Sequence, residues 1–504
     1  MEQKSIFFLF EFSEKMKCQF LRFLFIFLSI FVIVSIYSCK RNTSHSGRDF
    51  DIVIVNGRVI DPGSELDAIN NLGIRDGHVQ LITTKEISGQ TSINAEGLVV
   101  APGFIDIHSH GQDPENYKYK IMDGVTTALE LEMGTSDVDR WYDEREGKSL
   151  INHGVSAGHI PIRMRLMNDP GGFAPVGDAA YRAASDSEIV VLKEGITNGL
   201  NLGGLGVGFG MMYTPAASRW EIMEMFRVAA GFKAPCIVHM RYAGLKEPNS
   251  AISALEEVIS AAAITGAPLH VVHITSLGFS DTPRMLQMIK EARSHNMDVS
   301  VECYPYSATQ TTIESAIYDK GWQEILGIDY KDLQWAATGE RLNADRFAEY
   351  RKTGGMVIAH SIPDEIVRST IADSIVIIAS DGDMKGGKGH PRGVGTFARV
   401  LGKYVREDKL ISLSEGLRKI TLMPAKRLEG IAPMMKNKGR IHVGADADIT
   451  IFDPETIIDQ ATYEEPARFS KGISYVLVNG IIVVKDGQLQ DSIFPGTAVR
   501  GAIK

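Results

Sequence analysis

The sequence predicts an α/β fold: a (β/α)8 barrel of the TIM type with a small β-sandwich formed by the N-terminal and C-terminal segments. Between residues 101 and 430, eight apolar strand-like runs alternate with segments of helical periodicity, which is the pattern of parallel βαβ units. At 50–100 and 431–504, short strand-like segments with Asn-Gly or Asp-Gly turn signals recur. The chain has 504 residues, which is long enough to bury the cores of both units.

The first 49 residues have the layout of an export leader. Basic residues precede residues 23–37, which are apolar except for two serines and are short for a membrane span. The run ends in Ile36-Tyr37-Ser38-Cys39, which resembles a bacterial lipobox. We therefore expect an export and lipoprotein signal at 1–39, a lipid anchor at Cys39 and a tether at 40–49. This predicts an exported, membrane-anchored lipoprotein on the periplasmic or cell-surface side, with an uncleaved transmembrane anchor as the alternative.

Eight runs in the middle of the chain are predicted to be barrel strands. They are Phe104–His110, Thr126–Glu132, Val155–Ile162, Leu205–Met211, Cys236–Met240, Leu269–Thr275, Val299–Tyr304 and Ile375–Ser380. Helical periodicity lies between them, for example in Trp220–Ala230 and Ala251–Ile264. The interval from Ser307 to Asp373 is too long for a normal connection, so we expect an inserted subdomain or lid at about 307–373. The active site of such a barrel lies at the C-terminal ends of its strands.

The strand-like segments at the two ends of the chain are predicted to form the β-sandwich together. Near the N-terminus, Asn56-Gly57 and Asp76-Gly77 interrupt two such runs and are hairpin signals. Residues 439–452 and 473–484 have the same character. Two separated sets of short strands around a long α/β middle indicate one unit built from both ends.

Composition argues against two classes of protein. The formal net charge is −9 and no long Lys/Arg-rich run occurs, so we expect no nucleic-acid partner. Cys236 and Cys303 each lie inside an apolar strand-like run, which predicts two buried small side chains rather than a disulfide framework.

Histidines and one aspartate gather at the predicted C-terminal ends of the strands. His108 and His110 end the first strand, and both imidazoles should enter the barrel mouth because residues i and i+2 share a face. His239 ends the fifth strand, His273 lies near the end of the sixth, and Asp381 follows the eighth. Four imidazoles and a carboxylate at one end of the barrel predict a divalent-metal site.

The second strand carries two carboxylates on one face, Glu130 and Glu132, and these are costly to bury unpaired. Glu132 lies nearer the end of the strand and is preferred as the bridging metal ligand, with Glu130 supporting it; the opposite assignment stays open. The fourth strand has no lysine that could bridge two metals instead.

The other histidines fall outside this pattern. His270 lies three residues before His273, so we expect it to face the opposite way and to be structural. His360 stays undecided. Ordinary core or surface roles are expected for His153, His159, His295 and His442.

These residues resemble those of the amidohydrolase superfamily, and the match runs from about Asp51 onward. Ala101–His110 looks like the first-strand motif of the superfamily, and Gly444–Ile449 looks like its C-terminal signature. Further segments narrow the resemblance to the D-aminoacylase and N-acyl-D-glutamate deacylase branch. They are Gly124–Thr127, Tyr304–Tyr306, Ile358–Pro363, Ser380–Gly382, His390–Arg392 and Gly395–Phe397.

Two positions depart from that branch, where the strand-two ligand is commonly a cysteine in an Asn-Cys-Gly context. This chain has Glu132-Met133-Gly134 there, and it has Thr275 where many members have a lysine two residues after the strand-six histidine. The resemblance implies that Arg392 holds the α-carboxylate of a substrate as a bidentate donor. It also implies that Tyr213 and Tyr304 add hydrogen bonds, although ordinary packing would explain either tyrosine equally well.

The implied function is metal-dependent hydrolysis of the amide bond of small N-acyl-D-amino acids, with N-acyl-D-glutamate as one candidate. One or two Zn²⁺ ions would activate a water, and Asp381 would take its proton and pass it to the leaving amine. A cyclic-amide hydrolase of the dihydroorotase or dihydropyrimidinase kind and an isoaspartyl-type dipeptidase share the barrel and are alternatives. A non-catalytic, lipid-anchored binding protein is a further alternative.

Overall fold

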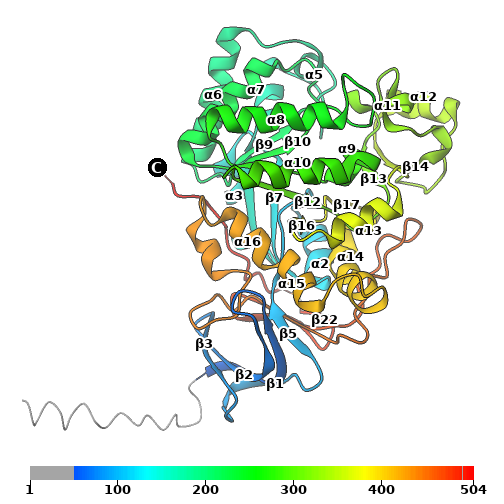
Figure 1. Cartoon of the computed structure of the whole chain (residues 1–504). Coiled ribbons are helices and arrows are strands. Elements are labelled where there is room, and N and C mark those ends of the chain that lie inside the picture. Colours follow the sequence, from blue (N-terminus) through cyan, green and yellow to red (C-terminus); the bar gives the residue numbers. More distant parts are fainter. Residues whose placement is uncertain (1–49, 491, 504) are drawn as a thin grey trace, which may run out of the picture. The chain divides into compact units, whose positions relative to one another are not determined.

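Eight parallel strands form the centre of the structure, a computed structural model that describes residues 50–490 and 492–503 (Figure 1). In hydrogen-bonding order they are β6 (Phe104–Asp106), β7 (Val125–Thr135), β8 (Asn152–Gly158), β9 (Val207–Gly210), β10 (Cys236–His239), β11 (Leu269–Val271), β12 (Val299–Cys303) and β16 (Val376–Ile378). Each neighbouring pair is parallel. Each strand overlaps one of the eight predicted runs, and the predicted (β/α)8 barrel is confirmed.

The barrel closes between β16 and β6 through the residues that follow these two strands. Ser109 and Gly382 form a parallel bridge, and the backbone N–H of Asp381 donates to the carbonyl oxygen of His108 over 2.8 Å. The ends of the first and eighth strands therefore lie side by side, although they are far apart in the sequence.

Helices cover the barrel in the connections between its strands. They include α2 (Pro114–Met122), α3 (Val138–Asp143), α4 (His159–Met167), α5 (Asp178–Tyr181), α6 (Asp186–Asn201), α7 (Arg219–Phe232), α8 (Ala251–Thr265), α9 (Ile274–Gly278), α10 (Thr282–Ser294), α13 (Asp364–Ala372), α14 (Arg392–Arg399), α15 (Leu413–Ile420) and α16 (Leu422–Leu428). Polar caps start several of them: Ser218 Oγ accepts from an N–H in the first turn of α7, and Ser185 forms a capping box with Glu188 on α6. The ring of Phe226 on α7 lies 5.3 Å from that of Phe209 on β9, so apolar faces hold helix and strand together.

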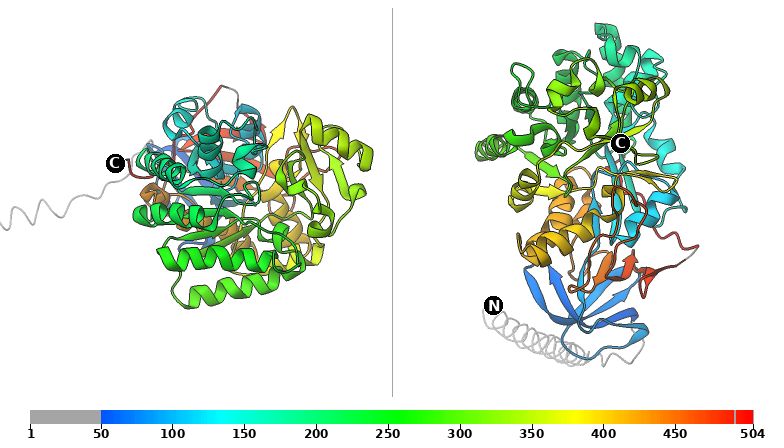
Figure 2. Two further views of the ribbon diagram at one scale, coloured as in Figure 1. Left: turned by 90° about the horizontal axis from the view of Figure 1, so that it is seen from above. Right: turned by 90° about the vertical axis from the view of Figure 1, so that its right-hand side faces the viewer.

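Strands from both ends of the chain form one nine-stranded mixed sheet, which Figure 2 shows as blue and orange-red arrows beside the barrel. Its order is β22 (Gln488–Leu489), β21 (Ile481–Lys485), β20 (Ile473–Val478), β19 (Ile449–Phe452), β5 (Val99–Pro102), β1 (Phe50–Asp61), β2 (Leu66–Arg75) and β3 (His78–Thr83), with β4 (Gly89–Asn94) paired to the first half of β1. The antiparallel pair of β5 and β19 joins the two ends. The predicted shared β unit is confirmed as a single sheet.

One of the two predicted hairpin turns in this sheet is wrong. Strand β1 continues through Asn56-Gly57, where Asn56 has a φ of 61° and the register with β2 shifts, so the dipeptide forms a bulge. A Cβ at Gly57 would lie 2.4 Å from a methyl group of Val100, so glycine is required by close packing rather than by a chain reversal. Asp76 and Gly77, with φ of 51° and 74°, do form the turn between β2 and β3.

The long interval after β12 contains a small antiparallel sheet beside the barrel. Its elements are β13 (Thr309–Thr312), β15 (Met356–Ala359) and β14 (Leu333–Trp335), with the helices α11 (Trp322–Leu326) and α12 (Ala344–Thr353). Stacked rings of Trp335 and Tyr350, 4.0 Å apart, belong to its core. Helix α13, which follows, packs against α10 and β16 and so belongs to the wall of the barrel.

The predicted export signal (1–39), the anchor at Cys39 and the tether (40–49) lie outside the described residues. Among the residues that the structure describes, no helix is long and apolar enough to span a bilayer. Cys236 and Cys303 are buried and form no disulfide, as their apolar surroundings predict.

Candidate metal centre

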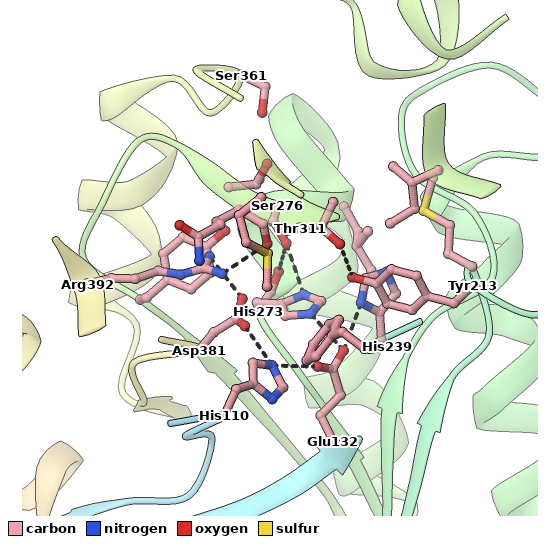
Figure 3. A pocket seen from close by; sticks show the side chains of 18 of the residues that line it. His110, Glu132, Tyr213, His239, His273, Ser276, Thr311, Ser361, Asp381 and Arg392 are labelled. Carbon is pink, nitrogen blue, oxygen red and sulfur yellow. Dashed lines mark hydrogen bonds and ion pairs between the residues drawn. The ribbon is translucent and has the colours of Figure 1, made fainter. Parts of the chain in front are cut away.

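Six polar side chains converge at the C-terminal ends of the barrel strands, and all of them except His108 are labelled in Figure 3. They are His108, His110, Glu132, His239, His273 and Asp381. Their candidate ligand atoms fall into two groups, and within each group these atoms lie within 4.8 Å of one another. The first group is His108, His110, Glu132 and Asp381, and the second is Glu132, His239 and His273.

Glu132 belongs to both groups because its two oxygens face in different directions. Oε2 lies 3.1 Å from Nε2 of His108 and 3.1 Å from Nε2 of His110. Oε1 lies 2.8 Å from Nδ1 of His239 and 3.3 Å from Nε2 of His273. One oxygen of the carboxylate is therefore available to each group.

Irregular backbone at the end of β7 directs Glu132 into the barrel mouth. The pairing of β7 with β8 shifts register between Glu130 and Thr135, which is the signature of a bulge. Strand β9 passes so close that a Cβ at Gly208 would lie 2.2 Å from the carbonyl oxygen of Glu132. Glycine at 208 therefore leaves room for the bulged strand.

Buried partners orient the imidazoles. Oε2 of Glu130 lies 2.8 Å from Nδ1 of His110, and Oγ of Ser276 lies 2.9 Å from Nδ1 of His273. In both His110 and His273, Nδ1 contacts this partner, and Nε2, which faces Glu132, does not. Such contacts fix the rotation and the tautomer of a ligand histidine.

Sequence reasoning missed the most deeply placed of these partners, Glu302 on β12. Its Oε1 lies 2.5 Å from Nδ1 of His108 and its Oε2 lies 2.9 Å from Nε2 of His270. Burial alone would raise the pKa of Glu302, but the charges and hydrogen bonds of His108 and His270 lower this pKa to about 2. A glutamate inside the apolar run Val299–Cys303 was the signal that could have revealed it.

His270 joins neither group, but the expectation that it faces away from His273 is wrong. It points into the barrel, where Glu302 connects it to His108. Strand alternation fails here because β11 ends at Val271 and His273 has a φ of 31°, which turns its side chain back over the mouth.

The remaining histidines in the described part of the chain also lie outside both groups. His360 lies 3.0 Å from the side-chain oxygen of Gln334, and His159 lies 2.7 Å from Glu221. His153 packs near the ring of Trp141.

The charges in the two groups favour a divalent cation. Burial opposes a charge on His108 and His110, yet the surrounding carboxylates raise the pKa of both imidazoles well above its usual value. Burial likewise opposes ionisation of Glu132 and Asp381, but neighbouring groups hold the pKa of each carboxyl well below its usual range. For Glu132 these groups are imidazoles, and for Asp381 they are Arg392 and imidazoles. The site thus gathers negative charge that requires cationic partners.

The donor set fits one or two such ions. Imidazole nitrogens and carboxylate oxygens are the ligands that Zn²⁺ takes in catalytic sites. In the second group, Nδ1 of His239 and Nε2 of His273 both face Oε1 of Glu132, so two imidazole nitrogens and one carboxylate oxygen are directed at one point. The residues of a binuclear metal site are therefore present.

A pocket lies over the two groups, and its walls are mostly apolar. The apolar and aromatic residues are Phe173, Met212, Tyr213, Leu277, Tyr304, Ile317, Tyr318, Leu326 and Met356. Several of these come from the inserted segment after β12, which therefore forms part of the pocket wall. Among the described residues that line the pocket, Arg392 is the one Lys or Arg.

Arg392 is buried at the first turn of α14 and faces Asp381 from the side. Its Nη1 lies 2.9 Å from Oδ2 of Asp381 without hydrogen-bond geometry, and its Nε has no hydrogen-bond partner among the described residues. Its guanidinium carbon lies 4.5 Å from the centre of the Tyr304 ring, so the ring holds the guanidinium plane. The guanidinium of Arg392 is therefore held in a fixed position, and some of its N–H groups remain without a hydrogen-bond partner in the described part of the chain and are directed at the pocket.

The two predicted tyrosines both line the pocket, with different partners. The hydroxyl of Tyr304 is buried and has no partner among the described residues. The hydroxyl of Tyr213 already pairs with Oγ1 of Thr311 over 2.8 Å, and its ring lies 5.0 Å from that of His239. Tyr304 is therefore the better placed of the two to bind a substrate oxygen.

Comparison with known proteins adds three findings. A model described as the amidohydrolase family matches residues 91–152 and 216–484. The D-aminoacylase of Alcaligenes xylosoxydans xylosoxydans is 29% identical to this chain, and the match covers 86% of this chain and 94% of that protein. The N-acyl-D-glutamate deacylase of the same organism is 27% identical, and the match covers 89% of this chain and 96% of that protein. The crystal structure of N-acyl-D-glutamate deacylase from Bordetella bronchiseptica, complexed with zinc and a phosphonate inhibitor, shares the fold with a TM-score of 0.77 at 24% identity, and the match covers 90% of this chain and 100% of that one.

Proposed function

Because this chain belongs to the amidohydrolase family, we propose that it hydrolyses N-acyl-D-amino acids that have an apolar side chain. It is a metal-dependent amidohydrolase of the D-aminoacylase branch. The substrate class is proposed from one observation. Two ligand groups share Glu132, and the pocket above them is mostly apolar and contains a single guanidinium. That guanidinium, Arg392, matches one carboxylate, and the α-carboxylate of an N-acyl amino acid supplies it.

The pocket argues against glutamate as the preferred side chain. A side-chain carboxylate would be bound best by a second cation, but Arg392 is the one Lys or Arg among the described lining residues. The other side-chain donors outside the ligand groups are neutral, among them Ser276, Thr309, Gln310, Thr311 and Ser361. Asp383 also lines the pocket, and a carboxyl group supplies no positive charge to pair with a second carboxylate. An unpaired buried carboxylate is costly, whereas an apolar side chain gains by leaving water.

We propose zinc as the metal, in agreement with the donors and with the zinc present in the Bordetella bronchiseptica deacylase. When bound, the metal supplies activated water and polarises the amide carbonyl. His108, His110 and Asp381 would hold it in the first group, and His239 and His273 in the second, with Glu132 between them.

The other steps belong to side chains of the protein. Arg392 and Tyr304 hold the α-carboxylate and so place the amide over the ligand groups. Asp381 takes the proton of the attacking water and passes it to the leaving nitrogen. Although burial opposes its charge, Arg392 and the neighbouring imidazoles lower the pKa of Asp381, so its carboxyl is ionised before the reaction and has an oxygen that can accept a proton.

A substrate panel tests the proposal. We expect the zinc-loaded protein to hydrolyse N-acetyl-D-leucine and N-acetyl-D-methionine with a kcat/KM at least about tenfold above that for N-acetyl-D-glutamate, because one pocket contact is worth that much. The L-enantiomers, a hydantoin and a β-aspartyl dipeptide complete the panel. Preference for the hydantoin or the dipeptide would support the cyclic-amide hydrolase or isoaspartyl dipeptidase alternative, and no turnover of any amide would support a binding protein.

We also propose that the protein is exported and lipid-anchored, which rests on the apolar run at 23–37 and on the lipobox-like Ile36-Tyr37-Ser38-Cys39. Cys39→Ser should move the protein from the membrane fraction to the soluble fraction or leave it unprocessed. Membrane association and processing that are both the same in Cys39→Ser and wild type would contradict a lipid anchor at this residue.

A further inference from the structure

A second cavity of about 390 Å³ lies beside the catalytic pocket, a volume within the range of small-molecule sites. The two cavities have two lining residues in common, His110 and Phe173. Phe173 packs edge-on against His110, with ring centres 5.1 Å apart, and its ring centre lies 6.5 Å from that of Tyr213. The ring of Phe173 thus stands as a partition between the two cavities.

The loop that carries Phe173 is held in a defined conformation. The carboxylate of Asp169 accepts backbone N–H bonds from Gly171, Val176, Gly177 and Ala179, at 2.8 to 3.0 Å. These bonds close the loop on both sides of Phe173, so the position of the partition is set by the backbone.

Strand order places this partition opposite the carboxylate-binding end of the catalytic pocket. Tyr304 follows β12 and Arg392 follows β16, whereas Phe173 lies on the connection after β8. In the eight-membered order of the barrel, β8 and β12 are four strands apart and face each other across the mouth. In Figure 3, Arg392 and Asp381 correspondingly lie on one side of Glu132, and Tyr213, from the strand next to β8, lies on the other.

The orientation of a substrate follows from this arrangement and rests on the proposed function. With its α-carboxylate on Arg392 and its amide over Glu132, the acyl group of an N-acyl amino acid extends toward Phe173. Beyond the ring, the second cavity is lined by apolar Met133, Ile160 and Met164 and also by polar side chains, among them Gln112, Asp113, Glu130 and Arg145. We infer that Phe173 sets the length of acyl group that the enzyme accepts, because its ring closes off the cavity that a longer chain would enter.

The inference also assigns a role to Met133. At the position where the D-aminoacylase branch commonly has a cysteine, Met133 lines the second cavity, while its neighbour Glu132 faces the ligand groups. An apolar side chain there suits a cavity that receives an acyl chain.

The test compares N-hexanoyl and N-acetyl derivatives of the one D-amino acid that the wild type hydrolyses best. In Phe173→Ala, the ratio of kcat/KM for hexanoyl over acetyl should rise about tenfold or more, and in Phe173→Leu it should rise less. Adding Met164→Trp to Phe173→Ala refills the second cavity and should bring the ratio back toward that of the wild type. Ile317→Ala, on the inserted segment, is the matched control: it should alter preference among D-side chains and leave the acyl ratio as it is.

The outcomes separate this inference from the proposed function. Unchanged acyl ratios in Phe173→Ala and Phe173→Leu, with N-acetyl substrate still hydrolysed, would overturn the role of Phe173 and leave the proposed function intact. Absence of turnover of any N-acyl-D-amino acid by the wild type would remove both. Inhibition of the wild type and of Phe173→Ala by hexanoate and acetate gives a second readout: hexanoate should gain affinity relative to acetate only when the ring is removed, and no such gain would count against the inference.

Discussion

Replacement of Glu302 should weaken metal binding at the first ligand group although Glu302 itself touches no metal. Its two oxygens accept from Nδ1 of His108 and from Nε2 of His270, and the side chain is 1% exposed. In Glu302→Leu, both imidazole N–H groups would lose their acceptor inside the barrel. In Glu302→Gln, one oxygen still accepts from His108, and the amide N–H2 can donate to His270 if that ring donates to Ser300 instead, at 2.7 Å.

The expected magnitude follows from these contacts. A hydrogen bond to a charged group contributes about 1.5–3 kcal/mol, and about 1.4 kcal/mol corresponds to a factor of ten in an equilibrium constant. Loss of the acceptor of His108 should therefore lower the metal affinity of the first group by about 10- to 100-fold in Glu302→Leu. Glu302→Gln, which loses the charge but keeps an acceptor, should lower it by about tenfold or less.

The assay is competition for Zn²⁺ with a chromophoric chelator, followed by urea unfolding of the metal-free proteins. The second group, Glu132 with His239 and His273, makes no direct contact with Glu302 and should keep its affinity. Wild-type affinity at both groups in Glu302→Leu would refute the idea that this carboxylate orients His108. Equal losses at both groups would show general damage to the barrel instead.

Three further predictions concern other parts of the barrel. Asp381→Asn should retain most of the metal, through His108, His110 and Glu132, while kcat falls by about 100-fold or more, which metal analysis and steady-state kinetics would check. Lys120→Met should destabilise the fold by about 3–5 kcal/mol in urea unfolding, because Lys120 Nζ lies 2.9 Å from the buried Asp106 and the change leaves that carboxylate with the neutral donors of His108 and Ser380 but without its cation; a loss below 1 kcal/mol would contradict this. Burial, together with the charges of Arg145 and Arg500, lowers the pKa of His153 from its usual 6.5 to about 4. Between these two pH values His153 is protonated in the unfolded chain but not in the folded chain, so the free energy of unfolding decreases as the pH drops from 6.5 toward 4. Between pH 7.5 and pH 5 the wild type should lose about 2 kcal/mol more than His153→Gln, and parallel pH profiles of the two proteins would count against the assignment.

The barrel was predictable because its signal is periodic and local. Eight apolar runs separated by helical patterns allow few architectures, and strand and helix periods survive small errors in the ends of each element. The bulge at Asn56-Gly57 could not be distinguished from a hairpin turn in the sequence, because the same dipeptide supplies the positive φ that both a bulge and a turn require. What decides between them is the close approach of Val100 to Gly57, a contact between strands that no local pattern contains.

The site was predictable where each residue ends a strand and not where the chain turns. His108 and His110 lie just beyond the end of β6, where the bridge at Ser109 keeps the backbone extended, so they still follow the i, i+2 rule and their meeting over Glu132 follows from the sequence. The direction of His270 does not follow, because the positive φ of His273 interrupts the alternation that would separate them. Glu302 was overlooked because a buried acid gains its meaning from partners on other strands, which only the closed barrel supplies.

The carboxylate of Glu132 has a consequence for how the two ligand groups depend on each other. A cysteine, common at the adjacent position in the D-aminoacylase branch, would offer one sulfur for both groups to share. Glu132 gives each group its own oxygen, Oε2 toward His108 and His110 and Oε1 toward His239 and His273. Removing the carboxylate must therefore weaken both groups, whereas removing an imidazole weakens only its own group. Because the two oxygens are part of one rigid, planar carboxylate, a rotation of Glu132 moves both oxygens at once and changes its contact with both groups. The bulge of β7 together with Gly208 sets the backbone position from which this carboxylate projects.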